Sequence, residues 1–464
     1  MHDSNNVCMC TKSGLNMLES RPLLGGPMSI SKISKTISYL ALAGSALISE
    51  AAIAQNLQAQ TPVLPYDYST DRTTVANRQR PDYITPGIAV GNLTVRPMVE
   101  GGVGYSDNVF GNETGGTSDW YAGFNPSILV EGSGGESSRR NFQLSLDANL
   151  RRYAQEKVAN QTAFGARANI TQPLGGPDNY ITIGGYANRS YERQESSGFP
   201  NAPVAPIKYD DFNGFARVRV GGSRVRATVG VDATHNKFSD ARLADGSVFD
   251  QGYRDRTIIR GSGRVETSFT GAVSAFVEGR YSNINYLRDM QTPTLANRDG
   301  NQAEALAGMM IDAGKLRGSI AGGYTRRTFD SSTYKDFGGF ALNGEMVYFA
   351  SGLSTVTLSG YRNITESGDP LISAQFGTGV AAKIDHELLR YIILKGSVSY
   401  DRYTFRNSSR NDNVAMVTGG VRYLANRHLE VNADASYVKR SSSGGGFGPE
   451  FDRLEFAVNL VGRF

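Results

Sequence analysis

From Leu93 to the end of the chain, apolar and polar residues alternate in segments that are separated by polar connections. Successive side chains of a β-strand point to opposite faces, so each segment predicts a strand with one apolar and one polar wall. We count eighteen such segments. In the last segment, Leu454, Phe456, Val458, Leu460, Gly462 and Phe464 share one face, and Glu455, Ala457, Asn459, Val461 and Arg463 share the other.

The connections between these segments alternate in length. Tight turns such as Gly221-Gly222-Ser223 and Ala313-Gly314 alternate with long polar stretches such as residues 194–208 and 287–302. Long external loops and short periplasmic turns are typical of outer-membrane barrels. Residues 93–464 are therefore predicted to form an all-β, transmembrane antiparallel up-and-down β-barrel of about eighteen strands, with sixteen as the rival count. An even number of strands leaves both ends of the barrel chain in the periplasm.

Aromatic residues support this placement in a bacterial outer membrane. Amphipathic rings favour the headgroup level of a bilayer, so they form girdles at both interfaces. The terminal Phe464 is similar to the recognition signal of outer-membrane barrels, which makes outer-membrane lipid and the barrel-assembly machinery expected partners. The predicted girdle consists of Tyr281, Tyr324, Tyr400 and Tyr437 at one interface and Tyr423 near the other.

The residues before the barrel divide into three parts. Residues 28–54 have a basic start, an apolar stretch and a small-x-small site that ends at Ala54, as a secretory signal peptide does. Residues 1–27 are then an over-called start or a non-structural extension. Residues 55–92 are polar and rich in proline, and we interpret them as a periplasmic leader or partial plug, with a flexible tail as the alternative.

Two prolines fit the strand pattern less well. Pro97 and Pro126 fall inside the first two predicted strands. Proline cannot donate to a β-ladder, so we expect bulges or loose pairing there.

Composition narrows the functional classes. The chain holds 48 Lys and Arg against 44 Asp and Glu, a near balance that predicts no nucleic-acid partner. Its two cysteines, Cys8 and Cys10, lie upstream of the predicted cleavage site, so the mature chain would lack disulfides and thiolate metal sites. No apolar stretch reaches the roughly 18 residues of a helical membrane span.

The start of the barrel carries a more specific pattern. Gly104-Tyr105-Ser106-Asp107-Asn108-Val109-Phe110, followed by Ser118-Asp119-Trp120 and a strand through Pro126, resembles the opening of a family of uncharacterised outer-membrane β-barrel porins. Arg151 and Tyr153 are similar to that family's third strand. Some members of the family are associated with capsule or exopolysaccharide genes. The resemblance therefore implies passage of saccharides across the outer membrane.

Arginines gather on the polar face of three neighbouring predicted strands. Fixed charges that line a water-filled pore set its ion selectivity, so one interpretation is a preference for anions or acidic sugars. The alternative is a structural ladder in which these arginines pair with Asp232, Glu266 and Glu278. The lumen selectivity candidates are Arg217 and Arg219 on the sixth strand, Arg224 and Arg226 on the seventh, and Arg256, Arg260 and Arg264 on the eighth.

Enzymatic interpretations find little support, and we predict no catalytic, cofactor-binding or metal site. We expect His235 in an external loop and His386 and His428 at periplasmic turns, with none beside a serine on an outer strand face at membrane depth, as a barrel-borne lipase needs. No phosphate-binding loop, CxxC or HExxH pattern occurs in the barrel.

The sequence thus predicts a porin-like channel for hydrophilic solutes, with saccharides or exopolysaccharide as the favoured cargo. A barrel of this size generally leaves an aqueous lumen. The alternative is a non-conducting accessory component of a polysaccharide export or surface-assembly system, with export components as partners. We expect the leader to discriminate: a leader folded inside the barrel favours the accessory role, and a free leader favours the pore.

Overall fold

The computed structural model describes residues 64, 73–133, 141–176, 178–192, 194–195, 204–243, 246–288, 296–369, 371–406, 408–444, 448 and 450–464. The expected extension 1–27, both cysteines, the signal peptide 28–54 and its cleavage site at Ala54 lie outside the described residues.

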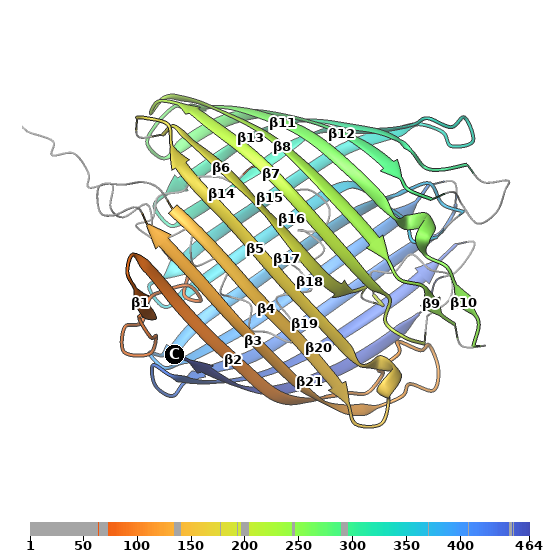
Figure 1. Ribbon diagram of the computed structural model, residues 1–464, viewed down its shortest axis with the longest axis horizontal. Coiled ribbons are helices and arrows are strands. Elements are labelled where there is room, and N and C mark those ends of the chain that lie inside the picture. The colour runs from red at the N-terminus through yellow and green to blue at the C-terminus, as the bar shows by residue number, and fades with distance from the viewer. Residues whose placement is uncertain are drawn as a thin grey trace, which may run out of the picture.

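Eighteen antiparallel strands form a closed barrel, in which each strand pairs with its neighbours along the chain (Figure 1). The predicted fold class and strand number are confirmed. The barrel strands are β2 (Leu93–Ser106), β3 (Asp119–Ser133), β4 (Asn141–Tyr153), β5 (Gln161–Pro173), β6 (Tyr180–Tyr191), β7 (Lys208–Gly221), β8 (Val225–Phe238), β11 (Arg256–Ser268), β12 (Val273–Tyr286), β13 (Gly300–Ala313), β14 (Leu316–Phe329), β15 (Phe337–Ser351), β16 (Ser354–Thr365), β17 (Gln375–Leu389), β18 (Ile392–Phe405), β19 (Asn411–Leu424), β20 (Leu429–Ser443) and β21 (Phe451–Arg463).

The last strand closes the barrel against the first. Val99 of β2 is the partner of Gly462 in β21, and the two strands stay in register up to Ser106 and Glu455. The amide of Phe464 donates to the carbonyl of Pro97 at 3.2 Å. Every strand edge is thereby paired, as a structure surrounded by lipid requires.

The two prolines are accommodated without bulges. Pro97 and Pro126 pair in unbroken register between β2 and β3. The pairing of β3 with β4 is interrupted at Asn125 and Pro126 and resumes at Ser127 in the same register. The prediction of bulges is therefore wrong, and the prediction of loose pairing is confirmed at Pro126. Proline lacks the backbone donor, so pairing is lost locally while the register is kept.

A few short elements lie outside the barrel strands. Within the predicted leader, β1 (Ile88–Val90) pairs with the start of β2. The connection between β8 and β11 contains a two-stranded hairpin and a turn of 3-10 helix, and a second such turn follows β4. These elements are β9 (Ala241–Arg242), β10 (Val248–Phe249), η4 (Gly252–Arg254) and η3 (Lys157–Ala159).

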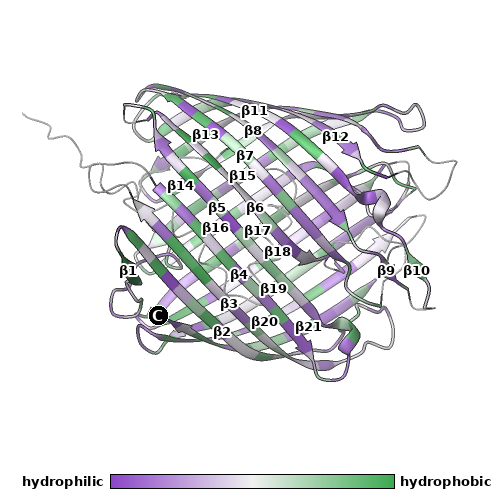
Figure 2. Ribbon diagram, viewed as in Figure 1, coloured by the Kyte–Doolittle hydropathy of each residue, from purple (hydrophilic) through white to green (hydrophobic). Residues whose placement is uncertain are grey.

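The two ends of the barrel differ. At the end that carries β1 and the C-terminus most connections are tight turns, and at the opposite end, which carries β9 and β10, most are longer (Figure 1). We call these the short-turn end and the long-loop end. Hydropathy alternates along the strands (Figure 2), and the apolar residues point outward: Val229, for example, is 63% exposed, while its neighbour Thr228 is 7% exposed. Within the part of the chain that the structure describes, no helix could span a bilayer.

The predicted girdle tyrosines are exposed on the outer surface. Each keeps between 40% and 57% of its surface accessible. Four of them lie toward the long-loop end and Tyr423 lies at the short-turn end of β19. These residues are Tyr281, Tyr324, Tyr400, Tyr437 and Tyr423.

Candidate functional site: the lumen wall and its two mouths

Most of the predicted arginines face the lumen. The register of β7, β8 and β11 aligns Arg219 with Thr228 and Thr228 with Arg264, on the side opposite to the exposed Val229. Arg224, which we expected on the seventh strand, instead lies exposed in the turn before β8. The lumen-facing set is Arg217, Arg219, Arg226, Arg256, Arg260 and Arg264.

Four of the arginines on this wall join three glutamates in a continuous network. Glu278 lies 2.5 Å from Nη2 of Arg264 and 2.5 Å from Nε of Arg280. Glu266 is shared by Arg226 at 3.3 Å and by two further guanidiniums at 3.5 Å. We call this network the Arg–Glu ladder; it comprises Arg219, Arg226, Arg264, Arg280, Glu266, Glu278 and Glu304, of which the last lies 2.6 Å from Arg280.

The ladder is buried inside the barrel. Glu266 and Arg264 are each 1% exposed, and Glu278 is 3% exposed. Buried charges are tolerated when opposite charges pair with them, so this arrangement supports the structural alternative for the ladder arginines. Arg217 differs, since it is only half-buried and its guanidinium lies 4.3 Å over the ring of Phe215. A selectivity role for the predicted set remains a prediction.

The leader contacts the lumen wall near the short-turn end. We call residues 73–83 the leader segment. Its Val75 is fully buried against Ile393 of β18 and Leu424 of β19. The amide of Val75 donates to Oγ1 of Thr355 on β16 at 3.3 Å. The leader segment therefore lies inside the mouth of the barrel and touches four strands from β16 to β19.

Ion pairs hold the leader segment to β17. Oε2 of Glu387 accepts hydrogen bonds from Arg78 at 3.0 Å and from Arg80 at 2.7 Å. Arg80 and Glu387 are buried, whereas the side chain of Arg78 is 34% exposed. The carbonyl of Ala76 accepts a further contact from Arg422 of β19 at 3.5 Å. One wall carboxylate thus anchors two leader guanidiniums.

Leu64 lies deeper in the lumen. Its carbonyl accepts a hydrogen bond of 2.8 Å from Nη2 of Arg264, the central arginine of the ladder. Leu64 is 1% exposed, and a methyl group added at Gly230 of β8 would lie 3.3 Å from its side chain. Leu64 therefore lies against the Arg–Glu ladder.

At the long-loop end, Gln194 and Glu195, which follow β6, contact strands on another part of the barrel wall. Nη2 of Arg453 lies 3.1 Å from Glu195, and Nη1 of Arg440 donates to the carbonyl of Gln194 at 2.5 Å. These arginines belong to β21 and β20, and four strands separate β6 from β21 around the barrel. Gln194 and Glu195 therefore lie over the lumen at this mouth.

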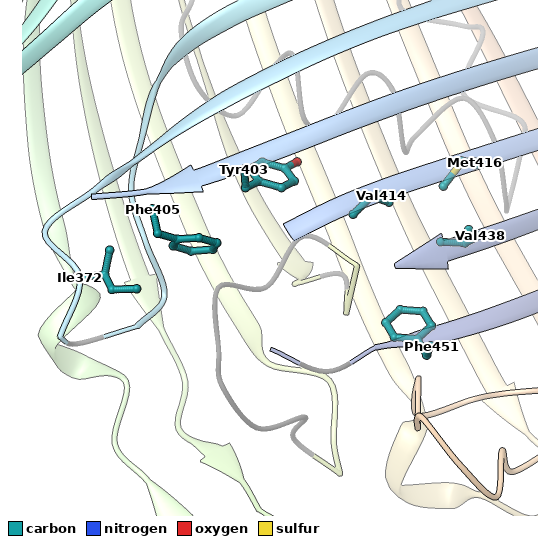
Figure 3. Packing of buried hydrophobic residues seen from close by; sticks show 7 residues of the cluster. All are labelled: Ile372, Tyr403, Phe405, Val414, Met416, Val438 and Phe451. Atoms are coloured by element: carbon teal, nitrogen blue, oxygen red, sulfur yellow. The ribbon is translucent and has the colours of Figure 1, made fainter. Parts of the chain in front are cut away.

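A second inward contact joins the connections that follow β8, β12 and β16. The hydroxyl of Tyr253 donates to the carbonyl of Gly368 at 2.5 Å. Arg298 donates to the carbonyls of Ser367 at 3.0 Å and Ile372 at 3.1 Å. The side chain of Ile372 belongs to a buried cluster on the lumen side of β18 to β21 (Figure 3), whose other members are Tyr403, Phe405, Val414, Met416, Val438 and Phe451.

Glu366 is the charged centre of this second contact. Burial by itself would raise the pKa of Glu366, but the guanidiniums of Arg327, Arg256 and Arg298 and a hydrogen bond from Tyr286 outweigh it, so the pKa lies below the usual range. The carboxyl is therefore ionised at neutral pH and attracts the surrounding arginines.

The lumen is not filled throughout. Asp147 of β4, Arg167 of β5 and Glu345 of β15 face inward and are exposed, and the side chain of Lys383 on β17 keeps 29% of its surface accessible. These residues line the part of the lumen that water can reach. The sequence did not single out these residues, because their strands alternate like all the others. Their exposure depends on which parts of the wall the leader and the loops leave uncovered.

The histidines differ in part from expectation. His235 lies within β8 and faces outward, not in an external loop, because the strand continues to Phe238. Nδ1 of His386 is 2.8 Å from Oγ of Ser354 on the outer face near the short-turn end, so a serine does stand beside a histidine. A catalytic base uses Nε2 while a carboxylate holds Nδ1, and here Nδ1 contacts the serine. The pair therefore has the geometry of a structural hydrogen bond.

The closed barrel, its apolar outer wall and its charged lumen define a β-barrel of the outer membrane. A family model described as "Putative beta-barrel porin 2" matches residues 80–464, and the chain belongs to this family, as its opening strands had indicated. It is thus a porin-like outer-membrane channel and not an enzyme. Among the described residues, no group of three or more His, Cys, Asp and Glu could hold a metal ion.

Solved structures with a similar fold include several outer-membrane proteins. OpdK from Pseudomonas aeruginosa is 10% identical, with coverage of 80% of this chain and 99% of that chain and a TM-score of 0.42. OccK2 from the same organism, solved in complex with glucuronate, is 11% identical, with 80% and 98% coverage and a TM-score of 0.44. OccAB4 from Acinetobacter baumannii is 9% identical, with 80% and 98% coverage and a TM-score of 0.42. No curated protein matches the chain.

Proposed function

We propose that this channel passes small hydrophilic solutes, with saccharides as the favoured cargo, through a lumen narrowed at both mouths. The observation that carries the proposal is the strip of water-accessible charges on facing walls. Asp147 and Arg167 lie on β4 and β5, and Glu345 and Lys383 lie on β15 and β17, about half a circumference away. Both signs of charge occur on each wall, which supports weak ion selectivity and passage of neutral polar molecules.

Planar-bilayer conductance of the refolded mature chain tests the proposal. We expect small channels with weak ion selectivity, together with faster liposome swelling in monosaccharide than in long oligosaccharide solutions. Absence of channel activity, both with and without residues 55–92, would contradict it.

The arginine wall needs a separate experiment. Replacing Arg256, Arg260 and Arg264 with glutamine lowers anion preference if these side chains act on passing ions. The structural alternative predicts loss of stability instead, because Arg264 sits at the centre of the buried ladder. Arg167→Gln and Arg217→Gln are the matched comparison, since these arginines face the lumen and are not members of the ladder. Unchanged reversal potentials in all these variants would dispose of arginine-based selectivity.

A second candidate is a non-conducting accessory component of a polysaccharide export or surface-assembly system. The contacts of Val75, Arg80 and Leu64 with the lumen wall favour this candidate by the criterion set from the sequence. A chain that is silent when complete and conducts after removal of residues 55–92 is a plugged channel. A chain that is silent in both forms supports the accessory role, which would require export components as partners.

We also infer that the terminal Phe464, which is 58% exposed, acts as a signal for the barrel-assembly machinery. Phe464→Ala should slow insertion into the outer membrane in cells and leave conductance of the refolded protein unchanged. Normal insertion of this variant would contradict the inference.

A further inference from the structure

The outer wall carries charge at one end only. Among the described strand residues that face outward, every charged side chain lies within five positions of the long-loop end of its strand, and basic residues outnumber acidic ones. The basic residues, which we call the outer basic belt, are Arg152, Arg189, Lys208, Lys237, Arg326, Arg362, Arg402 and Lys439; the acidic ones are Asp210, Asp336, next to β15, and Asp452.

The position of the belt follows from the aromatic girdle. On β14, Arg326 lies two residues beyond Tyr324, and on β18, Arg402 lies two residues beyond Tyr400. Lys439 stands in the same relation to Tyr437 on β20. Tyrosine girdles mark the headgroup level of a bilayer. The belt therefore lies at the level of the lipid headgroups in the outer leaflet.

The belt is densest on β6, β7 and β8. The register aligns Arg189 with Asp210 and Asp210 with Lys237, and Lys208 follows on the same face of β7. Arg189 donates to Asp210 at 2.7 Å and 2.9 Å, so one carboxylate stands among three cations. The patch therefore keeps an excess of two positive charges.

Exposed aromatic rings lie beside this patch, with Phe164 as the cross-strand partner of Arg189 and Phe212 two residues from Asp210 on β7. Phe164 and Phe212 are each 48% exposed, and the guanidinium of Arg189 lies 5.0 Å over the ring of Phe164. Cations beside exposed aromatic rings fit a ligand that joins a negative headgroup to hydrocarbon chains. A soluble polyanion would make no use of the rings, so the position and chemistry of the patch favour a lipid.

We propose that the outer basic belt binds the phosphate groups of phosphorylated lipids in the outer leaflet, and that Arg189, Lys208 and Lys237 form its strongest site. The asymmetry of the wall then matches the asymmetry of the membrane, because the apolar short-turn end faces the other leaflet. This role is separate from transport through the lumen, since these side chains point away from it.

The experiment measures binding of lipid A to the complete folded barrel in detergent, with the lipid phosphates intact or removed by phosphatase. Lys208→Gln/Lys237→Gln removes two cations and keeps the pair of Arg189 with Asp210. Each basic side chain near an anionic surface adds about fivefold to affinity, so we expect about a 25-fold loss in this double variant. Lys315→Gln/Arg390→Gln, which removes two exposed cations from turns at the short-turn end, is the matched control and should bind as the parent does.

The retained heat-modifiable gel mobility of each variant verifies that the barrel is folded before binding is compared. Equal affinity for intact and dephosphorylated lipid A would overturn the proposal. So would equal binding by the parent and the double lysine variant, an equal loss in both double variants, or full competition by millimolar inorganic phosphate, which would indicate a simple anion site.

Discussion

The contact between the leader segment and β17 predicts that a single carboxylate holds the leader segment in the short-turn mouth. In Glu387→Gln the side chain keeps its size and loses its charge. Arg80, whose side chain is 7% exposed, then stands without its ionic partner beside a neutral amide. Removing one partner of a buried ion pair costs about 3–5 kcal/mol. The pair with Arg78 adds little, because an ion pair with a partner 34% exposed contributes about 0–1 kcal/mol.

A loss of about 3 kcal/mol corresponds to about a hundredfold rise in the fraction of molecules whose leader is undocked. Docking protects the backbone around Arg78, so we expect trypsin to cut after this residue at least tenfold faster in Glu387→Gln than in the parent. The barrel itself should remain resistant, because its strands are unchanged.

Glu345→Gln is the matched control for this experiment. It makes the same chemical change at a lumen-facing carboxylate on β15, a strand for which we identify no contact with the leader segment. If cleavage after Arg78 is equally slow in the parent and in Glu387→Gln, the ion pairs do not hold the leader, and the reasoning from burial is refuted. Equal acceleration in both variants would also refute it, because the effect would then not be local.

The lowered pKa of Glu366 predicts that the loop contacts at the long-loop end weaken in acid. The ionised Glu366 carboxylate contributes fully to stability above about pH 5, and this contribution is lost as the pH falls through the lowered pKa of the folded state. Proteolysis of the loops should therefore accelerate between pH 5 and 3, and a flat profile would count against this. Glu278→Gln breaks two buried ion pairs and should lower the free energy of unfolding in lipid vesicles by about 3–5 kcal/mol; a loss below about 1 kcal/mol would show that the ladder is not structural. Gly102→Ala places a methyl group against Asn459 and the backbone of β21 at the closing seam, so we expect about 1–3 kcal/mol of destabilisation. Gly101→Ala, whose added methyl group meets only atoms at 4.0 Å, should be neutral, and equal stability of the two variants would contradict the packing argument.

A large part of this structure could be predicted from short-range patterns in the sequence. The alternation around Val229 and Val458 determines which side of each strand meets lipid, because a strand has a period of two residues. Tight turns such as Ala313-Gly314 join neighbouring strands and hold them in register, so the order of strands and the long-loop end follow from connection lengths. The strand limits were less accurate, as His235 shows, because polar residues at the end of β8 still pair with β11.

The arginine wall was visible in the sequence only as a set of residues on one face. The alternation placed Arg219, Arg226 and Arg264 on the lumen side, and it left selectivity and pairing as open alternatives. The partners are cross-strand neighbours and residues two strands away, such as Arg219 and Glu266. Side-chain length and local crowding decide these contacts, and neither has a period along the chain.

The sequence by itself determined that this protein is an outer-membrane barrel of about eighteen strands, with an apolar outer wall and a closing terminal strand. These properties depend on short-range alternation and turn length. Only the tertiary structure decided which distant segments contact the lumen wall. Leu64 meets Arg264 and Glu195 meets Arg453 across about two hundred residues of chain or more. Such contacts arise where a closed barrel brings distant segments into one enclosed space, and no local pattern records them.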